Sequence, residues 1–105
     1  MKNKLSVLIV IHNEEKILAS CLEKLIFCDE IVIILDKCSD NSEIIAKKFT
    51  NQIHKGDWKY EGDRRNFGIN HCNHNWILEI DADEHVSDKL GKEIIQKINI
   101  TFIHN

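Results

Sequence analysis

The chain has 105 residues, enough for one small domain with a single core. Apolar residues make up 43% and charged residues 30%, which is typical of a globular protein rather than a disordered one. The formal net charge is −3, so no strongly basic surface is predicted, and nucleic acid is not expected as a partner. No apolar run is long enough to span a bilayer, and the short apolar run near the N-terminus lacks a cleavage site, so we expect a cytoplasmic protein.

The cysteines do not predict a metal or redox centre. None of the four forms a Cys-x-x-Cys pair, so we expect reduced thiols that pack in the core. The segment His71-Cys72-Asn73-His74 leaves two interpretations open: a metal site, or polar residues near the end of a helix.

In the first half of the chain, two apolar segments are predicted strands, and a helix is predicted after each. Leu5–Ile11 is continuously apolar and rich in β-branched residues, as expected of a strand covered on both faces, and Glu30–Leu35 has the same character. Asn13 is the predicted N-cap of the first helix, and Ser42–Phe49 is the second helix. The positions expected to face the core are Ile17, Leu18, Cys21, Leu22, Leu25 and Ile26 in the first helix and Ile44, Ile45 and Phe49 in the second.

The second half continues the same alternation. Asn51–His54 and Asn75–Ile80 are predicted strands, Asp63–His74 and Val86–Ile98 are predicted helices, and residues 99–105 could begin a further strand. The last helix is expected to face the core with Leu90, Ile94, Ile95 and Ile98. This order predicts an α/β fold in one domain over residues 1–105, with a mainly parallel sheet of about four strands flanked by helices.

A short acidic segment, Asp81-Ala82-Asp83-Glu84, directly follows the last predicted strand. Asp81 and Asp83 are two residues apart, so a locally extended chain points both carboxylates to one side. Two hard oxygen ligands at the mouth of an α/β sheet suit a divalent cation that carries a phosphate. The alternative is a solvated acidic turn that caps the next helix.

Polar residues also follow the other predicted strands, where ligands of parallel sheets bind. They are His12-Asn13-Glu14 and the turn 36–41, while Arg64 and Arg65 begin the third helix and could join them. Trp58 and Tyr60, in the loop before that helix, could touch a sugar or a base or could cover the core. No glycine-rich dinucleotide motif or P-loop is present, which disfavours dinucleotide oxidoreductases and P-loop NTPases.

Four segments together resemble family 2 glycosyltransferases. Residues 5–15 resemble the opening of that family, 30–42 its second strand and aspartate-rich turn, 62–69 its arginine segment, and 81–86 its Asp-x-Asp motif. The loop Gly56-Asp57-Trp58, taken with the Arg-Asn-x-Gly and Asp-Ala-Asp-Glu segments, is most similar to the branch of lipopolysaccharide-core glucosyltransferases.

The resemblance implies the Rossmann-like half of a GT-A fold that binds a nucleotide-sugar, expected to be a UDP-sugar, with Mg²⁺ or Mn²⁺. Matched position by position, it implies that Asp83 is the main metal ligand and that Asp81 shares this site or faces the ribose or donor sugar. It further implies nucleotide contacts for the residues Asn13, Glu14, Asp36 and Arg65, with Arg65 rather than Arg64 as the family arginine. Leu35 is an alternative to Asp36, because the aspartate turn is one residue short.

The resemblance also implies the reaction, an inverting transfer of the sugar to a glycan or lipid-linked acceptor. Members of the family are about twice as long, and no residue here matches their catalytic base, so we expect a truncated donor-binding domain. A non-catalytic nucleotide- and metal-binding fragment therefore remains the alternative. Peripheral association with the inner face of the membrane stays open, as does self-association through an exposed edge near residues 100–103.

Overall fold

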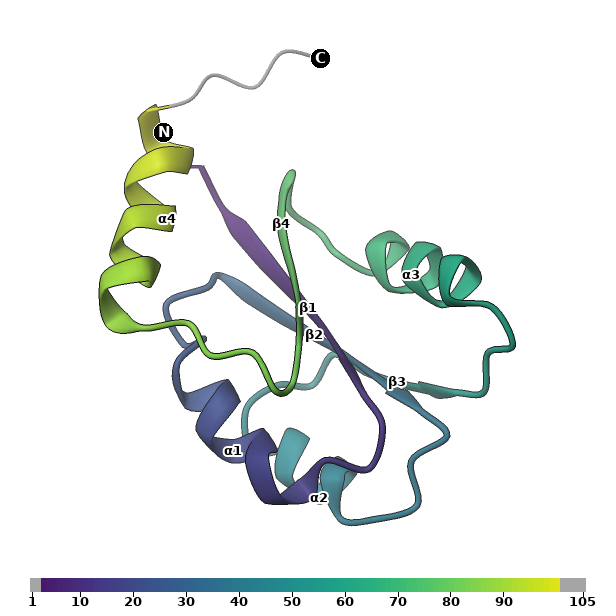
Figure 1. Ribbon diagram of the computed structural model, residues 1–105. Helices are drawn as coiled ribbons and strands as arrows, with labels where there is room; N and C mark the ends of the chain where they lie inside the picture. Colours follow the sequence, from purple (N-terminus) through teal and green to yellow (C-terminus); the bar gives the residue numbers. More distant parts are fainter. Residues whose placement is uncertain (1–2, 101–105) are drawn as a thin grey trace.

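The computed structural model describes residues 3–100 and confirms the predicted alternation of strands and helices (Figure 1). The elements are β1 (Leu5–Ile11), α1 (Glu15–Glu23), β2 (Glu30–Asp36), α2 (Ser42–Ala46), β3 (Ile53–Gly56), α3 (Glu61–Asn70), β4 (Trp76–Asp81) and α4 (Asp88–Ile100). The four strands form one parallel sheet in the order β3-β2-β1-β4. The α/β fold class expected from the sequence is therefore confirmed.

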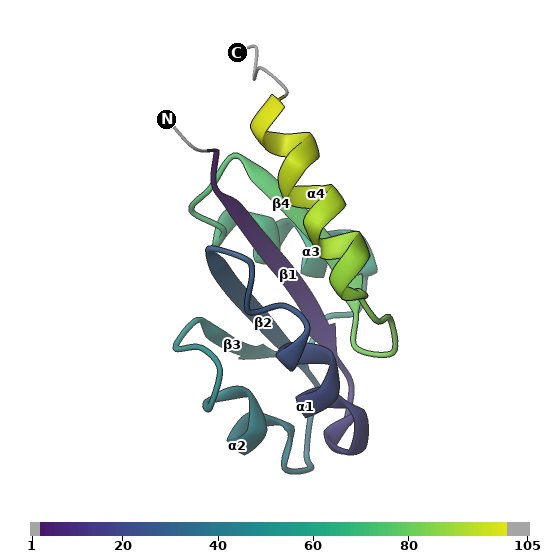
Figure 2. The same cartoon turned by 90° about the vertical axis from the view of Figure 1, so that its left-hand side faces the viewer.

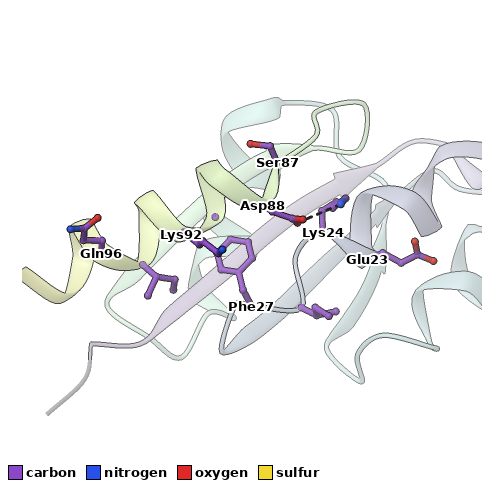
Figure 3. A pocket seen from close by; sticks show the side chains of 10 residues that line it. Glu23, Lys24, Phe27, Ser87, Asp88, Lys92 and Gln96 are labelled. Carbon is purple, nitrogen blue, oxygen red and sulfur yellow. Dashed lines mark hydrogen bonds and ion pairs between the residues drawn. The ribbon is translucent and has the colours of Figure 1, made fainter.

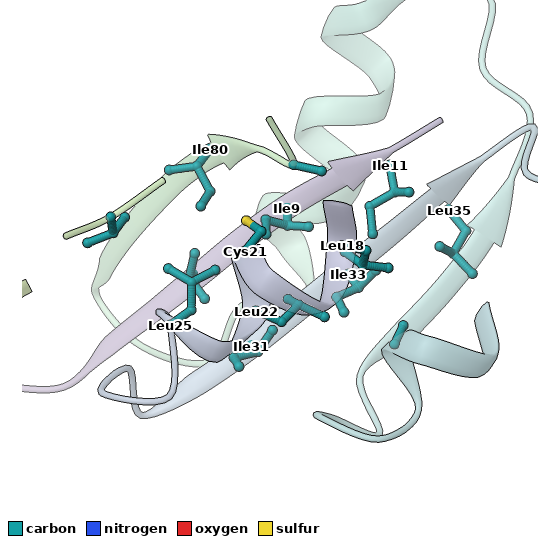
Figure 4. Packing of buried hydrophobic residues seen from close by; sticks show 14 residues of the cluster. Ile9, Ile11, Leu18, Cys21, Leu22, Leu25, Ile31, Ile33, Leu35 and Ile80 are labelled. Atoms are coloured by element: carbon teal, nitrogen blue, oxygen red, sulfur yellow. The ribbon is translucent and has the colours of Figure 1, made fainter. Parts of the chain in front are cut away.

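The helices cover both faces of the sheet, as Figures 1 and 2 show, with α1, α2 and α4 on one face and α3 on the other. Successive strand residues point to opposite faces, and both faces are covered, which explains why the two central strands are apolar except at Ser6 of β1 and at the two ends of β2, Glu30 and Asp36. On the α1 face, residues such as Ile9, Ile33 and Ile80 pack with Leu18 and Leu22 (Figure 4). The α3 face carries a smaller hydrophobic cluster. Four buried strand residues pack there with side chains of α3 and the loop before it, such as Phe67 and Trp58; the four are Leu8, Val10, Val32 and Ile34.

The predicted start of the first helix was wrong. Asn13 is not the N-cap, because its φ of 51° is left-handed and Glu14 occupies that position without a capping side-chain hydrogen bond. The amides at the helix start are instead satisfied from the β2–α2 turn and the first residue of α2. Asp40 Oδ2 accepts a hydrogen bond from the Glu15 amide at 3.1 Å, and Ser42 Oγ accepts one from the Glu14 amide at 3.2 Å. The side chains that cap this helix therefore come from a distant segment of the chain, which is why the local sequence could not identify them.

Several helix boundaries and inward positions also differ from the expectation. Helix α1 ends at Glu23, so Ile26 lies beyond it and is 74% exposed. Helix α2 ends at Ala46, three residues earlier than predicted. Ile44, within this helix, is exposed, while Ile45 and Phe49 pack on the core. The third helix ends at Asn70, four residues earlier than predicted.

The last helix begins later than predicted. It starts at Asp88, and the preceding Ser87 accepts a hydrogen bond from the Leu90 amide at 3.1 Å through its hydroxyl. Ile94 and Ile98 pack inward as expected, whereas Leu90 is exposed. Helix α4 runs to Ile100, so residue 100 is helical, and the rest of the predicted final strand, residues 101–105, lies outside the described residues.

Candidate functional site

The carboxyl edge of the sheet gathers the polar residues that follow the strands. Asp36 is the last residue of β2, and Asp81, the last residue of β4, is paired in register with Val10 of β1. Val10 belongs to the cluster on the α3 face, and side chains alternate along each strand, so we infer that Asp81 lies on this same face. His12, two residues after Val10, contacts Asp36 and Arg64 of α3. The candidate site is therefore the edge of the sheet on its α3 face.

Asp36 is the buried centre of this edge, with a residue exposure of 1%. Its Oδ2 accepts a hydrogen bond from Arg64 Nη1 at 2.9 Å, and its Oδ1 accepts one from the Trp58 amide at 3.2 Å. Burial alone would raise the pKa of Asp36, but the hydrogen bonds from Arg64 and Trp58 and the nearby charges hold this pKa below its ordinary value. Asp36 is thus a buried carboxylate fixed by two donors from α3 and from the loop after β3.

His12 completes the network from β1. Its Nδ1 lies 3.1 Å from the Asp36 carbonyl oxygen, and its Nε2 lies 3.0 Å from Arg64 Nη1. A carbonyl oxygen can only accept and a guanidinium can only donate, so both contacts are hydrogen bonds only in the tautomer that carries its proton on Nδ1. The side chain is nevertheless 51% exposed, so part of the ring faces solvent while both nitrogens are engaged.

The side chains of Asn13 and Glu14 accept hydrogen bonds from backbone amides of the turns at this edge. The Oδ1 atom of Asn13 accepts hydrogen bonds from the amides of Ser39 at 2.6 Å and Asp40 at 3.1 Å. Glu14 Oε1 accepts a hydrogen bond from the His12 amide at 3.0 Å. The Asn13 contacts tie the turn after β1 to the turn after β2, and the Glu14 contact holds the turn after β1 itself.

The acidic turn after β4 is held by its own residues. Glu84 Oε1 accepts a hydrogen bond from the Asp81 amide at 2.7 Å, the Glu84 amide donates to the Asp81 carbonyl at 3.0 Å, and Ala82 is fully buried in the core. Asp81 and Asp83 are exposed, and neither carboxylate forms a hydrogen bond or ion pair with residues 3–100. The turn therefore presents two uncommitted carboxylates, whereas Glu84 is already engaged.

These two carboxylates fit a hard divalent cation only in part. Within the described residues, no group of three or more His, Cys, Asp or Glu side chains is arranged to hold a metal ion. Mg²⁺ in proteins is often bound by one or two carboxylates, with the remaining ligands from waters and substrate phosphates. The donor set at residues 81 and 83 therefore suits a cation that arrives with a phosphate, not a preformed all-protein site.

The two arginines of α3 lie in different surroundings. Arg64 is only 17% exposed and contacts Asp36 and His12, whereas Arg65 donates to Glu79 Oε2 on β4 at 2.7 Å from an exposed position. The sequence named both arginines, yet the resemblance pointed to Arg65, and the fold brings Arg64 to Asp36. No local signal separates two adjacent arginines at a helix start.

Trp58 packs on the core, in line with one of the two interpretations that the sequence left open. Its ring packs on the α3-face cluster with its centroid 5.1 Å from that of Phe67. Tyr60 is exposed, and Lys59 lies over its ring at 5.3 Å. At the opposite end of α3, His71 stacks on His54 with ring centroids 3.8 Å apart.

The described part of the chain also has hollows outside this network. A groove of about 600 Å³ runs between the end of α1 and α4 (Figure 3), on the face opposite α3, and Lys24 and Asp88 form an ion pair of 3.4 Å across it. A hollow of about 300 Å³ lies beside the ends of β2 and β3. Its two lysines are paired, Lys55 with Glu43 at 2.9 Å and Lys37 with Asp57 at 3.6 Å.

Among the described helices, none is long and apolar enough to cross a membrane.

This chain is similar to known proteins in both sequence and fold. The chain is 28% identical over 102 residues to the lipopolysaccharide core biosynthesis glycosyltransferase LpsC of Rhizobium meliloti, covering 92% of this chain and 37% of that protein. It is 29% identical over 92 residues to an uncharacterised glycosyltransferase of Rickettsia typhi, covering 87% of this chain and 32% of that protein. The chain thus spans about one third of the length of these relatives.

Two solved structures share the architecture. The mannosyltransferase PcManGT from Pyrobaculum calidifontis, in complex with GDP-Man and Mn²⁺, superposes with a TM-score of 0.75 at 14% identity, over 90% of this chain and 32% of that one. TarS 1–349 of S. aureus superposes with a TM-score of 0.72 at 22% identity, over 89% of this chain and 31% of that one. At these identities the likeness shows the fold, which is the expected Rossmann-like half of a GT-A glycosyltransferase.

The family follows from a match that spans nearly the whole chain. The family model described as Glycosyl transferase family 2 matches residues 6–101, from the second residue of β1 to just beyond α4. This range includes the network around Asp36 and the acidic turn after β4. The chain therefore belongs to glycosyl transferase family 2.

Proposed function

We propose that this chain binds a nucleotide-sugar donor, which we take to be a UDP-sugar, together with Mg²⁺ or Mn²⁺ at the carboxyl edge of its sheet. The observation that carries the proposal is the pair of uncommitted carboxylates, Asp81 at the end of β4 and Asp83 on the turn that follows it. Phosphate-bearing ligands bind beyond the carboxyl ends of parallel strands, and carboxylates are the ligands that such cations prefer.

In this proposal Asp83 is the main metal ligand, and Asp81 shares the cation or faces the ribose or donor sugar. A bound divalent cation supplies Lewis-acid stabilisation of the charge on the departing nucleoside diphosphate. The structure of PcManGT with GDP-Man and Mn²⁺ supports a metal-dependent donor site in a protein of this fold. Asn13, Glu14 and Asp36 belong to the nucleotide side of the site, and the resemblance adds Arg65.

For the full reaction, we propose inverting transfer of the sugar to a glycan or lipid-linked acceptor, in the cytoplasm or at the inner face of the membrane. The similarity to LpsC, named for lipopolysaccharide core biosynthesis, supports a lipopolysaccharide-type acceptor. No described residue is assigned as the base that takes the proton of the acceptor hydroxyl, and the chain spans about one third of its relatives. For these 105 residues on their own, binding of nucleotide and metal without turnover is therefore the second candidate.

The test is calorimetric titration of UDP, and separately of GDP, into the chain with and without Mn²⁺. We expect binding that requires Mn²⁺ and that weakens at least about tenfold in Asp83→Ala, as for loss of one charged ligand. Asp57→Ala is the matched control, because it removes an exposed carboxylate after β3 at the same edge. Equal affinity in Asp83→Ala, or no binding of either nucleotide by the unaltered chain, would overturn the proposal.

A further inference from the structure

Two histidines from different elements stack on each other. His54 lies on β3, and His71 is the C-cap of α3. Their ring centroids are 3.8 Å apart, and the angle between the ring planes is 25°. Phe67 of α3 contacts both rings, with its centroid 5.9 Å from that of His54 and 4.6 Å from that of His71. The histidine pair therefore connects the end of α3 to an edge strand of the sheet.

The stack does not have the geometry of a metal site. A histidine binds a metal ion through the lone pair of a ring nitrogen, so the ion lies in the plane of the ring. Two rings that are 3.8 Å apart and nearly parallel cannot both direct a lone pair at one ion. Residues 3–100 also contain no group of three or more His, Cys, Asp or Glu side chains that could hold a metal. The stacked pair therefore needs another interpretation.

Helix α3 is held to the sheet by few side chains. Gly68 is the one buried residue of Glu61–Asn70, and Phe67 and Ile69 are partly buried against the cluster on this face. The start of the helix is fixed by the ion pair between Arg64 and the buried Asp36. Its end has ring contacts with β3 through the histidine pair. The stack is thus a large part of what holds the last turn of α3 against β3.

Protonation opposes this stack. Two imidazolium rings at 3.8 Å would repel each other, and a partly buried ring has lost some of the water that stabilises its charge. Burial, and then the charge of His71, accordingly lowers the pKa of His54. Among the described residues, no carboxylate forms an ion pair with either ring that could compensate.

The other charged groups near the pair do not take over its protons. Cys72 follows the second histidine, and burial, then the charge of Glu30, raises the pKa of its thiol to about 11. The charge of His74 acts on Glu30, not on the stacked pair. Lys55 is next to the first histidine, but side chains alternate along β3, so it lies on the other face, where it pairs with Glu43 at 2.9 Å.

We propose that His54 and His71 form a proton-sensitive latch, which holds the last turn of α3 on β3 while the rings are neutral and opens in mild acid. The start of α3 stays in place, because Asp36 keeps its charge, and its bond to Arg64, in mild acid. Acid thereby frees one end of the helix and leaves the other end fixed. The latch lies at the end of α3 away from the candidate site and does not depend on nucleotide binding.

The direction of the pH dependence follows from the two forms of His54. In the open form this histidine has its ordinary pKa of 6.5, and in the closed form its pKa is lower. The open form therefore takes up the proton first, and the equilibrium constant of opening rises as pH falls below 6.5 towards the pKa of the closed form.

Hydrogen exchange of the unaltered chain, followed by NMR, is the first test. The amides of residues 69–72 lie in the last turn of α3 and at its end, where those of His71 and Cys72 donate to Gly68 and Ile69. Their protection, corrected for the intrinsic effect of pH on exchange, should fall at least about fivefold from pH 8 to about pH 5. The amides of β1 and β2 should lose less. Constant protection at residues 69–72, or an equal loss in all these elements, would overturn the proposal.

The second test compares histidine variants. His54→Phe keeps a ring in the stack without a titrating group, so protection at residues 69–72 should stay within about twofold across the same pH range. His85→Gln is the matched control, because it removes an exposed histidine and should keep the full loss. His71→Phe gives a result even if the first variant does not fold. It should show a smaller loss than the unaltered chain, since the repulsion between two charged rings is gone. A full loss of protection in either Phe variant would show that the pair is not the latch.

Discussion

Gly68 of α3 lies so close to Leu8 of β1 that a Cβ atom at position 68 would stand 2.7 Å from Leu8 Cδ1. It would also stand 3.3 Å from Ile34 Cγ1 of β2, and both neighbours are fully buried. Helix α3 therefore approaches the two central strands at a point where only a glycine fits without movement. This close approach sets the position of the helix that carries Arg64.

Gly68→Ala should destabilise the protein, because the added methyl forces α3 away from the sheet or Leu8 out of its rotamer. Overpacking of this kind costs about 1–3 kcal/mol, more than the roughly 1 kcal/mol that alanine gains over glycine inside a helix. Gly62→Ala in the same helix is the matched control, since a Cβ there meets nothing within 4 Å. Urea unfolding should give a lower midpoint for Gly68→Ala only, and equal midpoints for the two variants would contradict the close approach.

Asp36→Asn should reduce stability at neutral pH and change its dependence on acid. The pKa of Asp36 is lowered in the fold: burial would raise it, but Arg64 and the Trp58 amide bond the charged form. Its stabilisation is therefore complete above the ordinary value of 3.8 and is lost as pH falls through the lower pKa of the folded state. The free energy of unfolding of the two proteins should differ most above about pH 5 and converge in strong acid. A gap that stays constant with pH would contradict the buried pair.

His54 should make the protein less stable in mild acid. Burial, and then the charge of the stacked His71, lowers the pKa of His54 below 6.5. The contribution is present above 6.5 and is lost as pH falls towards the lower pKa of the folded state, because the unfolded chain takes up the proton first. His54→Phe keeps an aromatic ring beside Phe67 without a titrating group. Its unfolding free energy should fall less than that of the unaltered chain between about pH 8 and about pH 5.

Cys21, Cys28 and Cys72 should react slowly with alkylating reagents in the folded protein. Burial, as the largest cause, raises the pKa of Cys28 to about 12 and the pKa values of Cys21 and Cys72 to about 11. The nucleophile is the thiolate, so little reactive form is present near pH 8. Peptide mass spectrometry after a short iodoacetamide pulse should find these three unmodified, whereas the same pulse in urea should label them. Rapid labelling of Cys28 in the folded chain would contradict the raised pKa of this half-buried thiol.

Much of the fold was predictable because it depends on local pattern. The strands Leu5–Ile11 and Trp76–Asp81 were predicted within one residue of their observed bounds, since long apolar and β-branched runs have few alternatives. The start of α1 was not predictable, because Asp40 and Ser42, more than twenty residues away, satisfy the amides of its first turn. A cap supplied from another part of the chain leaves no mark in the sequence beside the helix.

Some features of the candidate site could likewise be predicted from the sequence, and others could not. Its location at the carboxyl edge and the exposed pair Asp81 and Asp83 follow from the order of strands and from the spacing of two carboxylates. The choice between Arg64 and Arg65 does not follow, because adjacent residues on a helix point about 100° apart and the sequence does not say which direction meets the sheet. Only the packing of α3 on Leu8 and Ile34 decides it.

The amino-acid sequence by itself determined the alternation of strands and helices, the parallel sheet and the edge where polar groups collect, because hydrophobic periodicity and turn chemistry act within a few residues. The tertiary structure alone decided that Asp36 is buried, that His12 and Arg64 share its network and that Asn13 clamps two turns. These properties arise where segments distant in the chain meet. Burial and hydrogen-bond partners there depend on how α3 and the turns dock on the sheet, which no local pattern records.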